Sequence, residues 1–426
     1  MSAEYRLPIV MMNKCNTKRT ALVLALVLCC ASFSGCGLFR SPDPSKGGVG
    51  RDTEGVSDTT PDTTTTDTTE TTESTAPPID SVKRVSILAV GDNIIHEAVF
   101  TDAKKRASDG EEYNFVPMYA DVADKIAAAD IAFINHESPI AGNDKGISGY
   151  PTFNSPREAG QALVDVGFDV INLANNHILD KGVAGARATA EYVRSLHVTE
   201  LGAYLDEEDH STLRITEVNG IRIAWLSFFD LSILWRTPDM TNIVIPLMDD
   251  DAKIKAEIEN AKANADFVIV SAHWGREQYE VTAEQKRVAA LMSEAGADVI
   301  LGHHSHIIQP VEWYENADGS RTLITYSLGN FLSTQYYSYN MVGGMLTFDI
   351  VMEDGVCTVE NPILNPTVTQ YSMNRDSLGI YMLSDYTEEL AKAHGTLVHS
   401  PDFSLEWIYK HVRSIISDEF LPVYFE

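Results

Sequence analysis

The sequence predicts a layered α/β domain over residues 83–352, in which mixed β-sheets are covered by helices. Two observations predict this fold class. Short apolar runs typical of buried strands alternate with longer stretches whose apolar residues recur at helical spacing. The alternation is interrupted at Asn219-Gly220, a strong β-hairpin signal, so we expect antiparallel pairs beside the parallel ones.

The expected strands and helices follow from these two patterns. Apolar runs predict strands at residues 85–90, 131–134, 170–173, 213–218, 221–228, 267–271, 299–301, 308–314, 323–327, 343–352 and 356–364. Helical spacing predicts helices at residues 116–129, 157–166, 182–196, 249–265, 283–295, 387–394 and 405–416. We expect residues 353–426 to form a C-terminal extension, a strand and helices packed on the domain, without chemistry of its own.

Composition and charge limit the functions that are open. The chain has 426 residues, of which 44% are hydrophobic, enough for one large domain or two medium ones. Its formal net charge at pH 7 is -29. The basic footprint that nucleic acid requires is missing, so nucleic acid is not an expected partner. An anionic substrate would have to be held locally, by a metal ion or an arginine.

Residues 1–36 predict a lipoprotein signal peptide rather than folded structure. A basic stretch precedes an apolar run, residues 20–31, which has the length of a signal core and is too short to span a membrane. Small residues then precede Cys36 and resemble a bacterial lipobox, although Phe33 is an unusual first residue for it. We expect lipidated Cys36 to anchor the chain extracytoplasmically to the bacterial cell membrane; an ordinary secretory signal is the alternative.

The segment after the signal predicts a flexible connection to the membrane. Residues 37–82 are rich in Thr and Asp and nearly free of apolar residues, so they cannot bury enough surface to offset the entropy of ordering. We expect a disordered tether. Cleavage before Cys36 would remove three of the five cysteines and leave Cys357 alone beside the lipidated one, so no internal disulfide is expected.

Histidines gather where the expected strands end. Seven of the twelve histidines lie there: His96, His136, His177, His273, His303, His304 and His306. Open α/β sheets bind ligands at the carboxyl ends of their strands, and neutral imidazole binds borderline metals. The pattern therefore predicts a metal centre. Because alternate residues of a strand point to the same side, we expect His304 and His306 to converge and His303 to point away.

The polar residues at these strand ends form motifs. In chain order they are Gly91-Asp92, Asn135-x-Glu137, Asn175-Asn176-His177-x-x-Asp180-x-Gly182, His273-Trp274-Gly275-x-Glu277, Gly302-His303-His304-x-His306-x-x-Gln309 and Ser327-Leu328-Gly329-Asn330-Phe331. Together they resemble the CapA family of poly-γ-glutamate capsule proteins, also called PgsA in some bacilli, over about residues 85–331. The resemblance implies a calcineurin-like metallophosphatase fold, two mixed sheets flanked by helices, and an extracytoplasmic place in capsule synthesis or export.

The resemblance also implies a centre for one or two divalent ions. One ion would be bound by Asn176, His273 and His304, the other by Asp92 and His306, and both would share Glu137. Position 94 is Ile where the ancestral metallophosphatase pattern has His, so the second site lacks one imidazole. Nitrogen and oxygen ligands without thiolate suit Mn, Fe or Zn and do not decide among them.

The remaining candidates surround the expected metal ligands. The resemblance makes His177 a general acid or charge stabiliser oriented by Asp180. The alternative for His177 is a residue at a helix start that bonds the backbone. Additional candidates for the site are His96, Asn135, Glu277 and Asn330.

Three functions stay open on the sequence. The first is a membrane-tethered component of capsule synthesis or export, with poly-γ-glutamate and membrane-embedded capsule synthetase subunits as partners. The second is an active metal-dependent phosphoesterase acting outside the cytoplasm. The third is a non-catalytic, metal-stabilised module that binds the polymer.

Overall fold

A computed structural model describes residues 82–234 and 239–425. The predicted signal peptide, Cys36 and all but the last residue of the predicted tether lie outside the described residues. Within the described ranges, no helix has both the length and the apolar character needed to cross a membrane.

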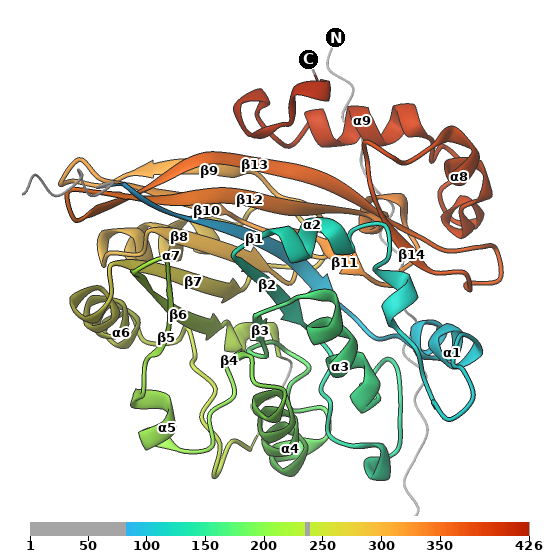
Figure 1. Ribbon diagram of the computed structural model, residues 1–426, viewed down its shortest axis with the longest axis horizontal. Helices are drawn as coiled ribbons and strands as arrows, with labels where there is room; N and C mark the ends of the chain where they lie inside the picture. Colours follow the sequence, from blue (N-terminus) through green and yellow to red (C-terminus); the bar gives the residue numbers. More distant parts are fainter. Residues whose placement is uncertain (1–81, 235–238, 426) are drawn as a thin grey trace, which may run out of the picture. The chain divides into compact units, whose positions relative to one another are not determined.

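The larger of two mixed sheets has eight strands (Figure 1). They are β1 (Lys83–Asn93), β2 (Ile131–His136), β3 (Val170–Asn172), β4 (Thr199–Leu201), β11 (Asn330–Leu332), β12 (Val342–Glu353), β13 (Val356–Gln370) and β14 (Gly379–Met382). The order is β14-β13-β12-β1-β2-β3-β4, with β11 paired to β1. Strands β1 to β4 and β11 run parallel, whereas β12, β13 and β14 are antiparallel additions.

The smaller sheet has six strands in the order β5-β6-β7-β8-β10-β9. They are β5 (Arg214–Val218), β6 (Ile221–Phe229), β7 (Phe267–His273), β8 (Val299–His303), β9 (Val311–Glu315) and β10 (Arg321–Thr325). The predicted hairpin is confirmed, because β5 pairs antiparallel with β6. Its turn residues Asn219 and Gly220 have φ of 52° and 71°, the positive values that a tight hairpin turn needs.

The two sheets pack against each other through apolar side chains. Phe133 of β2 stacks on Trp225 of β6 with ring centroids 5.9 Å apart, and both belong to one large buried cluster. A second apolar cluster lies between the smaller sheet and the helices α6 (Asp251–Asn264) and α7 (Ala283–Glu294). The predicted fold class, α/β with two mixed sheets flanked by helices, is confirmed.

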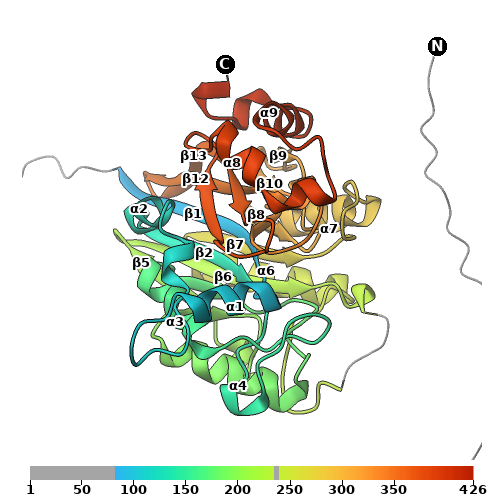
Figure 2. The same cartoon turned by 90° about the vertical axis from the view of Figure 1, so that its right-hand side faces the viewer.

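The other helices lie around both sheets. They are α1 (Glu97–Lys105), α2 (Ala123–Ala128), α3 (Arg157–Val166), α4 (Gly182–Ser195), α5 (Glu207–Ser211), α8 (Glu388–Ala393) and α9 (Leu405–Arg413). Figures 1 and 2 show α8 and α9 together on the opposite side of the molecule from α4.

The observed elements differ from the expected ones in three details. The predicted helix at residues 116–129 is a 3-10 turn, Val116–Met118, followed by the short α2, because Pro117 fits the start of a turn and the chain bends again before α2. The boundary expected at residue 353 falls inside the β12–β13 hairpin, where Glu353 pairs with Val356. The C-terminal part therefore adds two strands to the larger sheet, where one was expected, since β14 is too short to show alternation.

Candidate metal centre

The centre lies where parallel strands of both sheets end. Asp92 is near the end of β1 and Glu137 directly follows β2, both in the larger sheet. His273 ends β7 of the smaller sheet. Close backbone approach explains two motif glycines: a Cβ at Gly91 would lie 1.9 Å from the carbonyl oxygen of Gly329, and one at Gly302 would lie 2.0 Å from that of Tyr326.

The carboxylate of Glu137 is at the middle of the cluster. Its Oε1 atom lies 3.7 Å from Nε2 of His273 and 3.7 Å from Nε2 of His306. Nδ1 of His306 lies 3.0 Å from Oδ2 of Asp92. Nε2 of His273 lies 2.9 Å from Oδ1 of Asn176, and its ring centroid lies 4.9 Å from that of His304. The six predicted ligands are therefore brought together.

Two overlapping groups of these side chains have the spacing of metal ligands. One contains Glu137, His304 and His306, and the other contains Asp92, Glu137 and His273. Glu137 belongs to both, as a shared ligand would. The other residues are divided differently from the expected division, because His304 is grouped with His306 and His273 with Asp92.

Glu137 is the strongest structural indication of a metal. The residue is fully buried, and neither carboxylate oxygen has a hydrogen-bond partner among the described residues. Burial and the negative charges of Asp92 and Glu277 raise the pKa of Glu137 well above its usual value. A buried carboxylate without a partner costs several kcal/mol, roughly, unless a cation or a proton compensates it.

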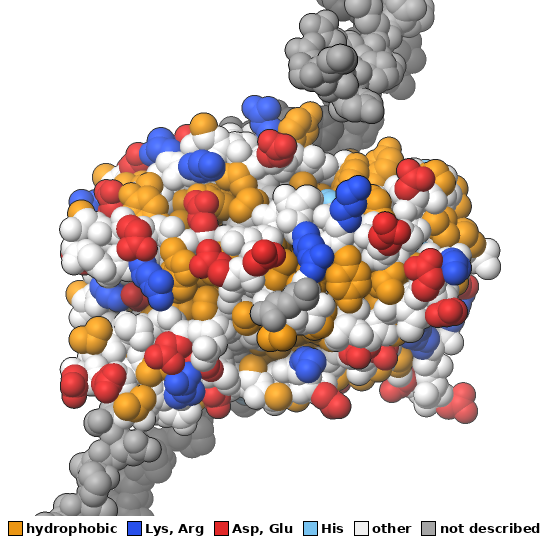
Figure 3. All heavy atoms as spheres, turned by 90° about the horizontal axis from the view of Figure 1, so that it is seen from above, with side chains coloured by type: hydrophobic (Ala, Val, Ile, Leu, Met, Phe, Trp, Pro, Cys, Tyr) orange, Lys and Arg blue, Asp and Glu red, His pale blue; other side chains and the backbone are white. Residues whose placement is uncertain are grey.

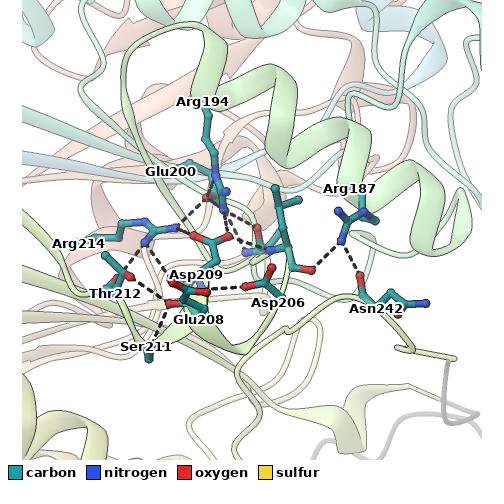
Figure 4. Close-up of polar contacts among 12 residues, drawn as sticks. Arg187, Arg194, Glu200, Asp206, Glu208, Asp209, Ser211, Thr212, Arg214 and Asn242 are labelled. Atoms are coloured by element: carbon teal, nitrogen blue, oxygen red, sulfur yellow. Dashed lines mark hydrogen bonds and ion pairs between the residues drawn. The ribbon is translucent and has the colours of Figure 1, made fainter.

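Glu200 is a buried glutamate whose negative charge is compensated by neighbouring residues of the protein (Figure 4). Its Oε2 atom accepts from Nη2 of Arg194 at 2.8 Å and lies 3.8 Å from Nη2 of Arg214, while Oε1 accepts from the backbone of Ala203 at 3.0 Å. Both carboxylate oxygens are thus satisfied. Glu137 has imidazoles around it instead of guanidiniums, which is the environment of a metal ligand.

Most of the surrounding imidazoles are neutral and ready to bind a metal. Burial and the nearby His306 lower the pKa of His304 to about 3. Burial and the nearby His304 lower the pKa of His273 well below its usual value. Burial alone would lower the pKa of His306, but its hydrogen bond to Asp92 and the charges of Asp92 and Glu277 raise it. Metal binding would release the proton of His306.

The two histidines of the His-x-His pair do converge, but strand alternation is not the reason. Strand β8 ends at His303, so His304 and His306 lie beyond it, with φ of 91° and 57°. This left-handed backbone brings their ring centroids within 5.9 Å. His303 stacks on Phe133 at 5.7 Å, and its Nδ1 lies 3.7 Å from Oδ1 of Asp92. Neither of its nitrogens has a hydrogen-bond partner among the described residues.

His177 and Asp180 form a hydrogen-bonded pair at the edge of the centre. Nδ1 of His177 lies 2.9 Å from Oδ2 of Asp180, which also accepts from the backbone of Phe153 at 2.6 Å. Only 15% and 13% of the two side chains are exposed. The predicted orientation by Asp180 is therefore present, and it leaves Nε2 of the imidazole available. The backbone nitrogen of His177 donates to Oδ1 of Asn175, and α4 begins only at Gly182.

A buried chain of hydrogen bonds through side-chain amides and a hydroxyl orients Asp92. Nδ2 of Asn135 donates to Oδ1 of Asp92 at 2.8 Å, Nδ2 of Asn172 donates to Oδ1 of Asn135 at 2.8 Å, and Ser227 donates to Oδ1 of Asn172 at 2.6 Å. The chain starts on β6 and so crosses from the smaller sheet to the larger. Asn135 thus positions a ligand. Asn172 and Ser227 were not predicted, because single polar residues inside apolar strands gave no signal beyond their position.

The other additional candidates lie around the cluster. Nδ1 of His96 accepts from the backbone of Thr334 at 3.3 Å, and burial with the nearby His306 lowers the pKa of His96 to about 3. Glu277 is exposed, and its charge raises the pKa of His306. Asn330 is buried, its Cα pairs in register with Asp92, and its Oδ1 has no hydrogen-bond partner among the described residues.

The fold and the cluster define a class of protein: a two-sheet α/β protein with buried histidines and carboxylates that fit a divalent metal. Sequence comparison gives the family. The model of the family described as "Bacterial capsule synthesis protein PGA_cap" matches residues 86–335, more than half of the chain, and the chain belongs to that family.

Individual relatives agree with this assignment. The chain is 32% identical over 257 residues to the "PGA biosynthesis protein CapA" of Bacillus subtilis, a match that covers 59% of this chain and 66% of the relative. It is 34% identical over 187 residues to the "Capsule biosynthesis protein CapA" of Bacillus anthracis, covering 43% of this chain and 44% of the relative. The chain thus spans less than two thirds of the length of these relatives.

Two solved structures are distantly similar to this chain. The NAD nucleotidase of Haemophilus influenzae aligns with a TM-score of 0.43 and 14% identity, covering 78% of this chain and 67% of that one. A 5'-nucleotidase precursor from Thermus thermophilus aligns with a TM-score of 0.43 and 12% identity, covering 66% and 54%. Likenesses at these scores are too weak to bear on activity.

Proposed function

We propose that this chain is an extracytoplasmic, membrane-tethered protein of capsule synthesis or export whose work depends on the metal centre. The observation that carries the proposal is Glu137, a fully buried carboxylate without a hydrogen-bond partner among the described residues, surrounded by His273, His304, His306 and Asp92. The ligands would be these five side chains and Asn176. Bound divalent ions would polarise a phosphoryl or carboxyl oxygen and lower the pKa of bound water.

The family and the relatives support the capsule part of the proposal. Two relatives carry names that refer to PGA or capsule biosynthesis, and a third, from Mycobacterium tuberculosis, is named a probable polyglutamine synthesis accessory protein. Poly-γ-glutamate is accordingly the polymer we propose, with membrane-embedded synthetase subunits as partners. The face drawn in Figure 3 has acidic and basic side chains interspersed, without the basic stripe that nucleic acid requires.

A gene-replacement experiment in the native host tests this function. Cells carrying Glu137→Gln or His273→Ala should lose surface capsular polymer, because the centre can no longer hold its metal. Cells carrying Glu200→Gln, which changes a buried glutamate outside the centre, should keep the polymer if that variant accumulates normally. Normal polymer in Glu137→Gln cells with the variant protein present would contradict the proposal.

Hydrolysis of a phosphoester is the second candidate function, and the His177–Asp180 pair favours it. Asp180 fixes one imidazole nitrogen at 2.9 Å and leaves the other to hold or move a proton at a leaving group. Turnover of a generic phosphodiester by the Mn-loaded chain, lost in His177→Asn, would support hydrolysis. Full metal content without turnover would instead support a non-catalytic, metal-stabilised module.

A further inference from the structure

The C-terminal part of the chain reaches the edge of the metal centre through the loop between β13 and β14. Arg375 lies on this loop, outside the residues that the family model matches. Its Nη1 atom donates to the hydroxyl of Tyr336 at 3.1 Å, and its Nη2 atom donates to the carbonyl oxygen of Thr334. Thr334 in turn donates its backbone N–H to His96. Thr334 therefore joins the guanidinium to His96, an imidazole that lies beside the centre.

His96 connects this arginine to the expected reaction site. The ring of His96 lies 5.4 Å from that of Phe153, which lies 4.6 Å from the ring of His177. After burial, the positive charges of His306 and Arg375 are the next largest causes that lower the pKa of His96. Arg375 is thus a cation that is linked through Thr334 to His96, whose ring senses the charges of His306 and His177.

Arg375 has donors that its neighbours leave unused. A guanidinium has five N–H groups in a planar fork. In the described structure, Nη1 and Nη2 each bond one neutral oxygen, and the buried Nε has no partner. No carboxylate lies within ion-pair distance of Arg375 in residues 82–234 and 239–425, although the chain has 61 acidic residues and only 32 basic ones. Within the described residues, no carboxylate therefore neutralises the charge of Arg375, and each Nη atom keeps one further N–H.

The loop holds this side chain in place. The guanidinium lies 4.6 Å from the centroid of the Tyr336 ring, and Tyr336 is 48% exposed. Asp102 of α1 accepts from the backbone of Ser377 at 3.1 Å and of Leu378 at 3.0 Å, which fixes the loop to a helix. Arg375 itself has φ of 57°, and a non-glycine residue keeps such a conformation only where its surroundings hold it.

We propose that Arg375, supported by Tyr336, binds an anionic group, a carboxylate or a phosphate, of a ligand that extends into the metal centre. The inference rests on the proposed metal-dependent function, because the ligand would contact both the metal centre and Arg375. The planar fork suits bidentate binding of either anion. A chain of formal charge -29 repels free anions at long range, so a local cation is what would retain one.

The test compares Arg375 with an arginine in a similar setting elsewhere. Arg321 also stacks on an aromatic ring, that of Trp313 at 3.9 Å, but it begins β10 at the end remote from His303, since Leu323 pairs with Val299. Full-length, metal-loaded wild type, Arg375→Gln, Arg375→Lys and Arg321→Gln are titrated by calorimetry with a short γ-linked glutamate oligomer and, separately, with inorganic phosphate. Metal content and melting temperature are recorded for every variant.

Arg375→Gln should weaken binding of at least one anion about 10- to 100-fold, the usual effect of removing a charge-assisted hydrogen bond. Arg375→Lys should retain part of the affinity, and Arg321→Gln should match the wild type. If Arg375→Gln weakens binding of the oligomer alone, the group that Arg375 binds is a carboxylate. If it weakens binding of phosphate alone, that group is a phosphate. Equal affinities of wild type and a folded, metal-loaded Arg375→Gln for both anions would overturn the proposal. Loss of metal from the wild type itself would instead count against the proposed function.

Discussion

The Oε1 atom of Glu137 lies 3.7 Å from Nε2 of His273, although the two residues end strands of different sheets. Glu137 follows β2 of the larger sheet and His273 ends β7 of the smaller one. Carboxyl ends of parallel strands from both sheets therefore open onto one centre. The cluster depends on the packing of the two sheets, so it cannot form from either sheet alone.

Single histidine substitutions should separate ligands from their neighbours. His273→Ala and His304→Ala should each lose tight metal binding, because the remaining groups would bind with an open position. His303→Leu should keep the metal and the melting temperature, since it replaces a buried ring whose nitrogens are both unpartnered in the described structure. Metal per chain after dialysis checks this. Loss of metal from His303→Leu together with retention in His304→Ala would show that the ligand assignment is displaced by one residue.

The pH dependence of the metal-free protein should reveal the buried glutamate. The pKa of Glu137 is raised in the folded state, so its favourable contribution is present below the unfolded value and is lost as pH rises through the folded one. Metal-free wild type should therefore lose stability as pH rises above about 4.5, and Glu137→Gln should lose less. Melting temperatures across this range in chelator measure the difference.

Glu200→Gln is the matched control for that experiment. It removes the buried carboxylate that faces Arg194 and Arg214 and leaves Asp209 as their shared charged partner, so it should lower the melting temperature without changing metal content. A Glu137→Gln protein that falls in stability as Glu200→Gln does would mean that Glu137 is an ordinary structural carboxylate.

The strand-end motifs could be read from the sequence because each is local. Apolar runs followed by Asp92, Glu137 or His273 show where strands stop, whatever their later pairing. The assignment of strands to two sheets is not local, and neither is the chain from Ser227 through Asn172 to Asn135. The alternating side-chain directions of a strand could not predict the positive φ of His304, because β8 ends one residue earlier, at His303.

The amide chain behind Asp92 should tune metal affinity. Asn172→Ala removes the partner that orients Asn135, and groups behind a ligand typically change metal affinity by about 10- to 100-fold. Competition with a chelator of known affinity measures the change. Asn365→Ala is the control, because Asn365 makes its hydrogen bonds within the β12–β13 hairpin. Unchanged affinity in Asn172→Ala would limit that chain to a structural role.

His177 and Asp180 should affect turnover rather than metal binding if the chain is a hydrolase. His177→Asn should lower kcat by about 10²- to 10⁴-fold, the usual contribution of a positioned acid or base. Asp180→Asn should flatten the pH profile of kcat, because it changes which imidazole nitrogen carries the proton. Steady-state kinetics with a phosphodiester and metal analysis check both. Simultaneous loss of metal would move His177 into the ligand set.

Membrane anchoring is expected to depend on Cys36. Cys36→Ser should be released into the medium or remain unprocessed, because the lipid can no longer be attached to the thiol. Fractionation of cells expressing each form, with a lipid label, follows this. A processed Cys36→Ser protein that stays in the membrane fraction would point to the ordinary secretory signal and another mode of attachment.

Glu137 is expected to be a metal ligand. The most direct test is the metal content of the full-length chain purified without chelator. Elemental analysis should find one or two divalent ions of Mn, Fe or Zn per wild-type chain and a marked loss in Glu137→Gln, with Glu200→Gln like the wild type. Wild type that contains no metal and takes up none when Mn, Fe or Zn is added, or Glu137→Gln with undiminished metal, would contradict it.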